Sequence, residues 1–285
     1  TLNKSLACAK RTAAVLAVAP GMTYPDAAEA APLGTSAVEF RDVSFTYQGA
    51  GAPSLSGVSF AAKPGDTIGV IGGTGSGKST LVDLIPRFYD ATSGSVLLDG
   101  QDVSTLPQDV LREKVGVVPQ RAQLFQGSIR DNLRWGSERA TDAQLWRALT
   151  LAQAREVVEG KPGGLDFLLE QNGRNLSGGQ RQRLTIARAL VKEPEVLILD
   201  DSSSALDFAT DAALRRAVRG LKSTTFLVSQ RIACVRQADS ILVLDNGRLA
   251  GWGDHDTLMK TCPVYQEIYW SQFPEERPQG KEVQA

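Results

Sequence analysis

The chain has 285 residues, of which 42% are apolar and 22% charged, ordinary proportions for a globular protein with a sizeable core. A formal net charge of −1, with both signs interspersed, excludes the basic surface of a nucleic-acid-binding protein, so we expect no nucleic-acid partner. The single histidine, His255, and three widely spaced cysteines argue against a structural zinc site and fit a reducing cytoplasm.

The N-terminal segment differs in character from the rest of the chain. Residues 1 to about 19 are predicted to form an alanine-rich helix, and residues 20–36 a linker rich in Pro, Ala and Gly. The apolar stretch Thr12–Ala19 follows two basic residues, as in a signal peptide, but such a signal also needs a cleavage context. No apolar run approaches the ~18 residues that span a bilayer. Because the chain starts with Thr1 rather than Met, we expect it to be part of a longer protein.

From Ala37 onward, strand-like and helical patterns alternate. Val38–Tyr47 and the segment around Val58–Phe60 are rich in β-forming residues, and Thr67–Ile71 is almost entirely apolar, as in a strand covered on both faces. Further strands are expected at Val115–Val118, Val196–Leu199, Thr225–Val228 and Ile241–Leu244, and helices over 141–159, 178–192 and 208–220. The alternation predicts an α/β fold around a largely parallel sheet.

A glycine-rich segment follows the strand that ends at Ile71. Its sequence, Gly72-Gly73-Thr74-Gly75-Ser76-Gly77-Lys78-Ser79, matches G-x-x-x-x-G-K-[ST] and opens a predicted helix. Glycines let the backbone curl so that N–H groups point at phosphate oxygens, and a helix N-terminus adds partial positive charge. A glycine-rich turn without a ligand is the plain alternative. The strand before and the helix after favour a nucleotide site.

The chemistry of this loop assigns its side chains. We expect Lys78 to reach the β- and γ-phosphates, the Ser79 hydroxyl to ligate Mg²⁺, and Thr80 to add a hydroxyl to the α- or β-phosphate. The predicted nucleotide contacts in the loop are Gly73, Thr74, Gly75, Ser76, Gly77, Lys78, Ser79 and Thr80.

A carboxylate pair supports the nucleotide site. The apolar strand Val196–Leu199 runs into Asp200 and Asp201, and two acids at the end of a buried strand call for a nearby cation. Asp200 is therefore predicted to hold Mg²⁺. The alternative is a solvated turn.

Leu176-Ser177-Gly178-Gly179-Gln180 places small residues at the start of a predicted helix, where N–H groups and a hydroxyl can face a second phosphate. This pentapeptide and the Arg181–Leu190 segment after it resemble the signature region of ATP-binding-cassette (ABC) ATPases. The resemblance runs from about Val38 to Phe273. It implies a nucleotide-binding domain over residues 37–285: a P-loop NTPase with a RecA-like core, an antiparallel β subdomain and an α-helical signature subdomain at about 123–190.

The resemblance also implies a partner. In this family two cassettes pack head to tail, as a hetero- or homodimer, and each signature closes on the ATP of the other. Ser177, Gly178, Gly179 and Gln180 would then contact the partner's nucleotide rather than this chain's own.

Other positions match the family in order. Tyr47 resembles the aromatic residue that stacks on adenine, although a tyrosine simply paired in a sheet is an alternative. Gln120 resembles the Q-loop glutamine, which contacts Mg²⁺ and hinges the helical subdomain. Ser204–Asp207 resembles the loop that crosses the dimer interface. His255 falls in a late turn, where the resemblance implies a structural role.

Phe125–Leu133 is similar to exporter cassettes, in which the membrane domain precedes the cassette in one polypeptide. This implies that residues 1–36 are the tail of the last long helix of such a domain plus a linker. It also implies that the chain works at the cytoplasmic face of a membrane, as part of an integral transporter.

Two positions depart from the pattern of active family members. Asp201 stands where they carry Glu, and Gln230 stands where they carry the switch-loop histidine. A carboxylate displaced by ~1 Å can slow a reaction ~100-fold, and a glutamine side chain is neutral at every pH. Together the departures resemble the degenerate half of a heterodimeric bacterial multidrug-type exporter. That half binds MgATP, hydrolyses it poorly and completes its partner's active site.

Three alternatives remain open at this stage. The chain could be a non-hydrolysing, ATP-gated structural clamp, or half of a homodimeric exporter with atypical catalytic residues. A soluble ABC ATPase of chromosome or ribosome biology is the third, but the long coiled-coil insertion or second cassette usual there is not present in this sequence.

Overall fold

The computed structural model describes residues 2–19, 21–27, 34–202 and 204–277. A six-stranded sheet forms its centre, in the order β12-β11-β3-β10-β9-β6, and every neighbouring pair is parallel except β11 and β12. Its strands are β3 (Thr67–Gly72), β6 (Val115–Val118), β9 (Val196–Asp200), β10 (Thr224–Val228), β11 (Ser240–Asp245) and β12 (Arg248–Gly253). All six residues of β3 are buried, as its apolar sequence predicted. The α/β prediction is confirmed.

A second sheet is antiparallel, in the order β2-β1-β4-β5. It consists of β1 (Val38–Phe45), β2 (Leu55–Ala62), β4 (Ser93–Leu98) and β5 (Gln101–Asp102). Buried and exposed residues alternate along most of β2, as expected for a sheet with one face on the core. A two-stranded ribbon, β7 (Gly127–Ser128) with β8 (Leu168–Leu169), lies in the helical region.

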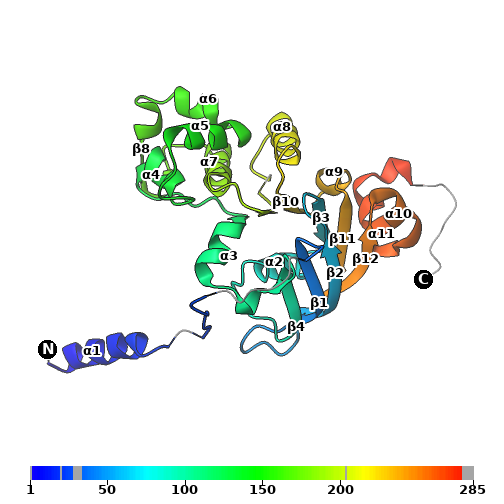
Figure 1. Cartoon of the computed structure of the whole chain (residues 1–285), viewed down its shortest axis with the longest axis horizontal. Coiled ribbons are helices and arrows are strands. Elements are labelled where there is room, and N and C mark those ends of the chain that lie inside the picture. The colour runs from blue at the N-terminus through cyan, green and yellow to red at the C-terminus, as the bar shows by residue number, and fades with distance from the viewer. Residues whose placement is uncertain (1, 20, 28–33, 203, 278–285) are drawn as a thin grey trace.

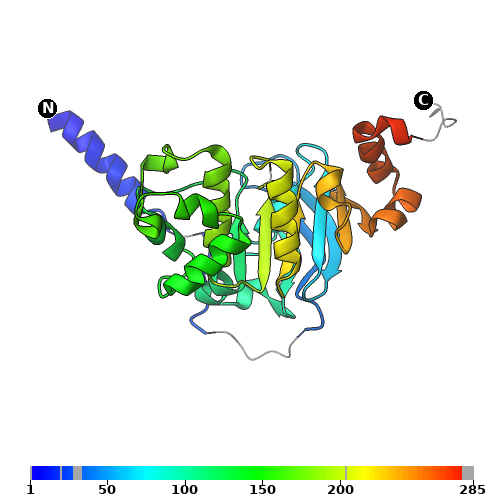
Figure 2. The same ribbon diagram turned by 90° about the horizontal axis from the view of Figure 1, so that it is seen from above.

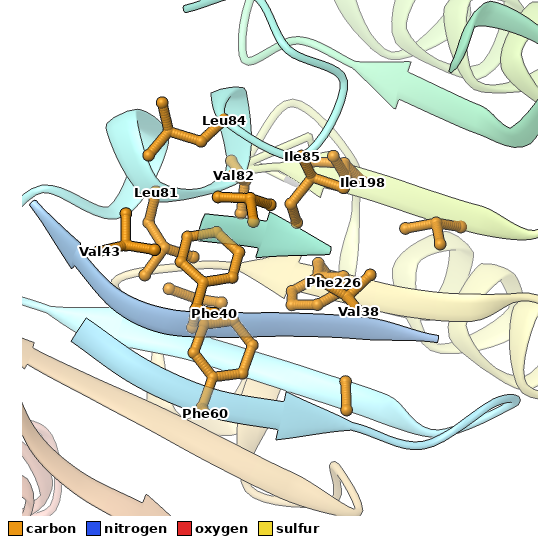
Figure 3. Close-up of a cluster of buried hydrophobic side chains, with 14 of the residues drawn as sticks. Val38, Phe40, Val43, Phe60, Leu81, Val82, Leu84, Ile85, Ile198 and Phe226 are labelled. Carbon is orange, nitrogen blue, oxygen red and sulfur yellow. The ribbon is translucent and has the colours of Figure 1, made fainter. Parts of the chain in front are cut away.

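The main core fills the space between the two large sheets (Figure 3). The rings of Phe40 and Phe60 stack with centroids 4.7 Å apart, and Phe60 meets Phe226 of the parallel sheet edge-on at 6.3 Å. Helix α2 (Lys78–Asp83) packs into the same cluster through Leu81 and Val82. The phosphate loop is therefore held between a buried strand and a buried helix.

A helical region has its own apolar cluster (Figure 1, green). It contains α4 (Ile129–Arg134), α5 (Asp142–Leu151), α6 (Arg155–Glu159) and α7 (Gly178–Leu190). The single helix predicted over 141–159 is wrong, because the chain breaks between α5 and α6. Gln153 there adopts a left-handed φ of 57°, which ends α5.

The remaining helices lie outside the two large sheets and the helical region. They are α1 (Leu2–Leu16), α3 (Gln108–Lys114), α8 (Phe208–Arg219), α9 (Ile232–Val235), α10 (His255–Thr261) and α11 (Pro263–Gln272), with 3₁₀ turns at Val103–Thr105, Gly164–Asp166, Gln171–Gly173 and Pro274–Glu276.

Helix α1 projects away from the body, at the end opposite to α10 and α11 (Figures 1 and 2). Its apolar side chains are exposed, with Val15 at 73% and Leu16 at 81%. Within the described part of the chain no helix is both long and apolar enough to cross a membrane. Residues 20 and 28–33 of the predicted linker lie outside the described residues.

The core between the sheets predicts a large stability effect. Replacing Phe40, which is 1% exposed, with Ala should lower the free energy of unfolding by about 3–5 kcal/mol, because the substitution leaves a cavity. Phe208→Ala is the matched control, since Phe208 is 78% exposed and should change stability by less than about 0.5 kcal/mol. Urea unfolding followed by circular dichroism measures both. Equal losses in the two variants would contradict this description of the core.

Candidate nucleotide-binding site

The site lies at the carboxyl edge of the parallel sheet. Val228 of β10 is in register with Val70 of β3 on one side and with Asp200 of β9 on the other. The loops that follow these strands therefore emerge side by side. They enclose a cavity of about 300 Å³ lined by Ser54, Thr74, Gly75, Gly77, Lys78, Ser79, Thr80, Gln120, Asp200, Asp201, Val228, Ser229 and Gln230.

The glycines of the loop shape its backbone. Gly75 and Gly77 have φ angles of 77° and 100°, in the left-handed region that glycine adopts without strain. A Cβ at Gly77 would lie 2.8 Å from the carbonyl oxygen of Ser54, so a side chain would also clash there. Gly77 is the N-terminal boundary of α2, which starts at Lys78. The loop thus turns sharply into the helix, as the motif predicts.

Lys78 lies inside the loop. Its ammonium group donates to the carbonyl oxygens of Gly72 at 2.9 Å and Gly73 at 2.7 Å. Burial lowers the pKa of Lys78, and the charges of Asp200 and Asp201 oppose that shift. A half-buried cation that donates to neutral carbonyl oxygens is well suited to receive an anion such as a phosphate.

The charges of two carboxylates, Asp200 and Asp201, act on Lys78, and a third carboxylate, that of Asp83, is influenced by the charge of Asp200. Burial raises the pKa of Asp200; the negative charge of Asp201 adds to this, while a hydrogen bond from Ser79 and the charge of Lys78 oppose it. Burial, together with the charge of Asp200, raises the pKa of Asp83 to about 6. The sequence did not single out Asp83, since its only local context is the last residue of the short helix α2.

This arrangement fits a divalent cation. A partly buried carboxylate whose charged form is disfavoured by burial and which is hydrogen-bonded to a hydroxyl belongs to an oxygen donor set of the kind Mg²⁺ takes. No three His, Cys, Asp or Glu side chains among the described residues gather closely enough to hold a metal by themselves. A Mg²⁺ ion at Ser79 and Asp200 would therefore draw its other ligands from phosphate and water, as is usual in nucleotide sites.

Asp201 and Gln120 meet across the cavity. The amide of Gln120 donates to a carboxylate oxygen of Asp201 at 3.4 Å, although the residues are 81 positions apart. Asp201 has a φ of 41°, uncommon for a residue other than glycine, and its N–H donates to the Val228 carbonyl at 2.9 Å. The strained backbone is thereby tied to β10, which places the Asp201 carboxylate beside Gln120.

Tyr47 and Thr80 also come together. The Tyr47 hydroxyl lies 3.0 Å from the Thr80 hydroxyl, so this ring is connected to the first turn of α2. The ring packs edge-on against Phe45 and Tyr89, with centroids 4.7 and 5.3 Å away. Because β1 ends at Phe45, Tyr47 is not paired within the sheet.

Ser76 differs from its neighbours in the loop. It is buried at 5% exposure, and its hydroxyl has no hydrogen-bond partner among the residues that the structure describes. Its N–H donates to the Gly73 carbonyl at 3.3 Å. Ser76 and Gly73 are the two predicted loop contacts that do not line the cavity.

The signature residues lie elsewhere. Ser177 caps α7: its hydroxyl accepts from the Gln180 N–H at 3.2 Å, and the Gln180 side chain accepts from the Ser177 N–H at 3.1 Å. Ser177 and Gly178 are exposed, and neither they nor Gly179 and Gln180 line the cavity. The structure therefore does not bring the signature to the chain's own phosphate loop.

Some residues at the cavity have no local sequence signal. Ser54 reaches it from the segment before β2, 18 positions before Gly72 at the start of the phosphate loop. Ser229 precedes the predicted Gln230 and could have been inferred from that neighbour. His255 is not in the cavity lining; its Nδ1 lies 2.9 Å from the Tyr265 hydroxyl.

Comparison with known proteins extends these observations. The model of the ABC transporter family matches residues 55–204. An ABC transporter ATP-binding protein of Bacillus subtilis (strain 168), YfiB, is 45% identical over 239 residues, which are 84% of this chain and 42% of that protein. An ATP-dependent lipid A-core flippase of Chromobacterium violaceum is 39% identical over 252 residues, 88% of this chain and 43% of the flippase.

A solved structure, that of a bacterial Atm1-family ABC exporter with ATP bound, superimposes with a TM-score of 0.87 at 32% identity. The match covers 98% of this chain and 48% of the exporter. The chain thus spans less than half the length of each of these relatives. The phosphate loop, the paired carboxylates and these matches together show that the chain belongs to the ABC transporter family and carries its ATP-binding domain.

Proposed function

We propose that this chain binds MgATP and, paired with a second cassette, powers the export of a substrate across a membrane on whose cytoplasmic face it works. The observation that carries the proposal is the convergence of Lys78, Ser79 and Asp200 on one cavity behind a glycine-rich loop. Export is supported by two relatives, which are named a flippase and an exporter.

In this proposal each side of the cavity has a task. The ammonium group of Lys78 exchanges its hydrogen bonds to the loop carbonyls for bonds to the β- and γ-phosphates. Thr80 and the loop N–H groups bind the remaining phosphate oxygens. Ser79, Asp200 and Gln120 hold Mg²⁺, which neutralises phosphate charge when bound. Tyr47 stacks on the adenine. The proposed nucleotide contacts of the loop are Gly73, Thr74, Gly75, Ser76, Gly77, Lys78, Ser79 and Thr80.

The proposal includes a second cassette as partner. Ser177, Gly178, Gly179 and Gln180 form a capped helix start, exposed at Ser177 and Gly178, that is absent from the chain's own cavity lining. Such a start presents N–H groups to an anion from another molecule. This supports a head-to-tail dimer in which each signature closes on the ATP of the other cassette.

The site of this chain is proposed to be the slow one of the pair. Asp201 and Gln230 both line the cavity, where a Glu and a His would orient water and contact the γ-phosphate. Aspartate is one methylene too short for the first task, and glutamine lacks the imidazole for the second. A non-hydrolysing clamp, or a homodimer with atypical residues, would use the same cavity differently.

A membrane domain is proposed to precede the cassette. The chain covers less than half of its relatives, and α1 exposes Val15 and Leu16 at the end of the body farthest from α10 and α11. We assign residues 1–36 to the tail of that domain and its linker, and 37–285 to the nucleotide-binding domain with its helical subdomain at about 123–190.

The first test concerns Lys78. Lys78→Ala should weaken MgATP binding about 10- to 100-fold, because a charge-assisted hydrogen bond contributes roughly 1.5–3 kcal/mol. Lys260→Ala, at an exposed position on α10 outside the cavity, is the control and should leave binding unchanged. Titration with labelled ATP measures both. An unchanged affinity of Lys78→Ala for MgATP would contradict the assignment of the phosphate loop.

The second test restores the expected catalytic pair. Asp201→Glu combined with Gln230→His should raise the ATP turnover of the homodimer of this chain by about 100-fold, since it supplies the water-orienting carboxylate and the imidazole. Adding Lys78→Ala to this variant should abolish the gain, which assigns the turnover to this site. A wild-type turnover of tens per second, typical of an ordinary enzyme, would show that the site is not degenerate.

The third test separates the two roles within the complex. With the partner co-expressed and the complex in lipid, Gly178→Asp should lower steady-state ATP hydrolysis at least about 100-fold, the size of effect expected when an oxyanion donor is lost. Asp201→Asn should lower it far less, because it alters the slow site. Gly21→Asp adds the same charge at an exposed position, where an added Cβ would meet no described atom within 4 Å apart from those of its chain neighbours, and is the control. Equal damage from Gly178→Asp and Asp201→Asn would favour the homodimer.

A further inference from the structure

The segment that carries Gln230 is tied to the C-terminal helix. The side-chain amide of Gln272, the last residue of α11, donates from Nε2 to the Gln230 carbonyl at 2.7 Å. Its oxygen Oε1 accepts the backbone N–H of Ile232 at 2.8 Å. One side chain therefore bridges two backbone groups on either side of Arg231, some 40 positions earlier in the chain.

These two hydrogen bonds pair backbone groups of the Gln230 segment. Helix α9 starts at Ile232, and Arg231 before it gives the helix no side-chain cap. A helix start has N–H groups without intrahelical partners, and Gln272 satisfies one of them from outside. The carbonyl of Gln230 is fixed by the same amide group, so the backbone cannot rotate at this point without breaking a bond.

The other end of the segment is also held. The N–H of Ser229 donates to the Val70 carbonyl of β3 at 3.1 Å, and its hydroxyl accepts from the Arg231 N–H at 3.1 Å. With Ser229 tied to β3 and Gln230 tied to α11, the direction of the Gln230 side chain depends on both attachments.

Helix α11, which carries Gln272, is itself held in place by buried contacts. Tyr265 and Tyr269 are 0% and 4% exposed, and they pack in one cluster with Ile232 and Val235 of α9. The hydroxyl of Tyr265 meets His255 Nδ1 at 2.9 Å, which joins α11 to α10. A shift of α11 would therefore move the Gln272 amide relative to β10.

We propose that Gln272 is a positioning residue for the ATP site: through the Gln230 backbone it sets where the Gln230 side chain meets the γ-phosphate. The inference rests on the proposed function, in which Gln230 faces that phosphate. It makes the C-terminal helix a determinant of how the site distinguishes ATP from ADP, which lacks the γ-phosphate.

The experiment measures the ratio of ATP to ADP affinity of the 285-residue chain, by equilibrium titration with each labelled nucleotide and Mg²⁺. Gln272→Glu keeps an acceptor for Ile232 but places an oxygen against the Gln230 carbonyl. We expect the ratio to fall roughly threefold to tenfold, the size of one hydrogen bond to the backbone, while ADP affinity stays the same.

The matched control is Gln266→Glu. Gln266 is on the same helix and its Nε2 donates to a backbone carbonyl, that of Met259, at 2.8 Å, but it does not reach the Gln230 segment. A purely structural role of Gln272 would make the two variants alike in thermal stability and in nucleotide ratio. Positioning predicts that only Gln272→Glu changes the ratio. If the Gln272→Glu variant does not fold, the Gln272→Met variant is measured in its place, with the same expected change in the nucleotide ratio.

A double-mutant cycle tests the route of the effect. In a Gln230→Ala background, Gln272→Glu should leave the ratio unchanged, because the side chain it positions is gone. An unaltered ratio in Gln272→Glu, in a wild type that does prefer ATP, overturns this inference alone. A wild type that binds neither nucleotide overturns the proposed function and the inference with it.

Discussion

The parallel pairing of β3 with β10, and of β10 with β9, is the constraint on which the rest of the structure depends. Parallel strands end at the same edge, so backbone hydrogen bonds alone bring together a glycine-rich loop, a carboxylate pair and the Gln230 segment. These come from positions more than 150 residues apart in the chain. The sheet determines where the site lies. The chemistry of the site depends on a few loop residues, and these can be substituted without changing the position of the site.

Burial at this edge of the sheet shifts the pKa values of the cation and of the carboxylates in opposite directions. It lowers the pKa of Lys78 and raises the pKa values of Asp200 and Asp83, so each charged form is less stable there than in water. Lys78 and Asp200 offset each other only in part. A ligand that carries both signs, such as a phosphate chain with its metal ion, would stabilise both charged forms, and this complementarity arises from the position of the residues in the fold rather than from any one of them.

Much of this could be predicted from the sequence, where the signal is local. The phosphate loop and the buried strands are contiguous patterns, and the structure has β6 at the residues that the apolar run indicated. Strand β12 was not predicted, because two of its six residues are glycines, which rarely mark a strand. The break at Gln153 depends on one residue in a left-handed conformation. The contacts of Ser54 and Gln272 join distant segments, and no periodicity along the chain reports them.

The reciprocal bonds between Ser177 and Gln180 have a consequence for association. They order the first turn of α7 within the single chain. A loop that folded only on contact with a partner would lose conformational entropy at that moment and would bind more weakly for the same contacts. In the proposed dimer, that entropy would already be lost during folding of the chain, so association would cost mainly the free motion of the two chains.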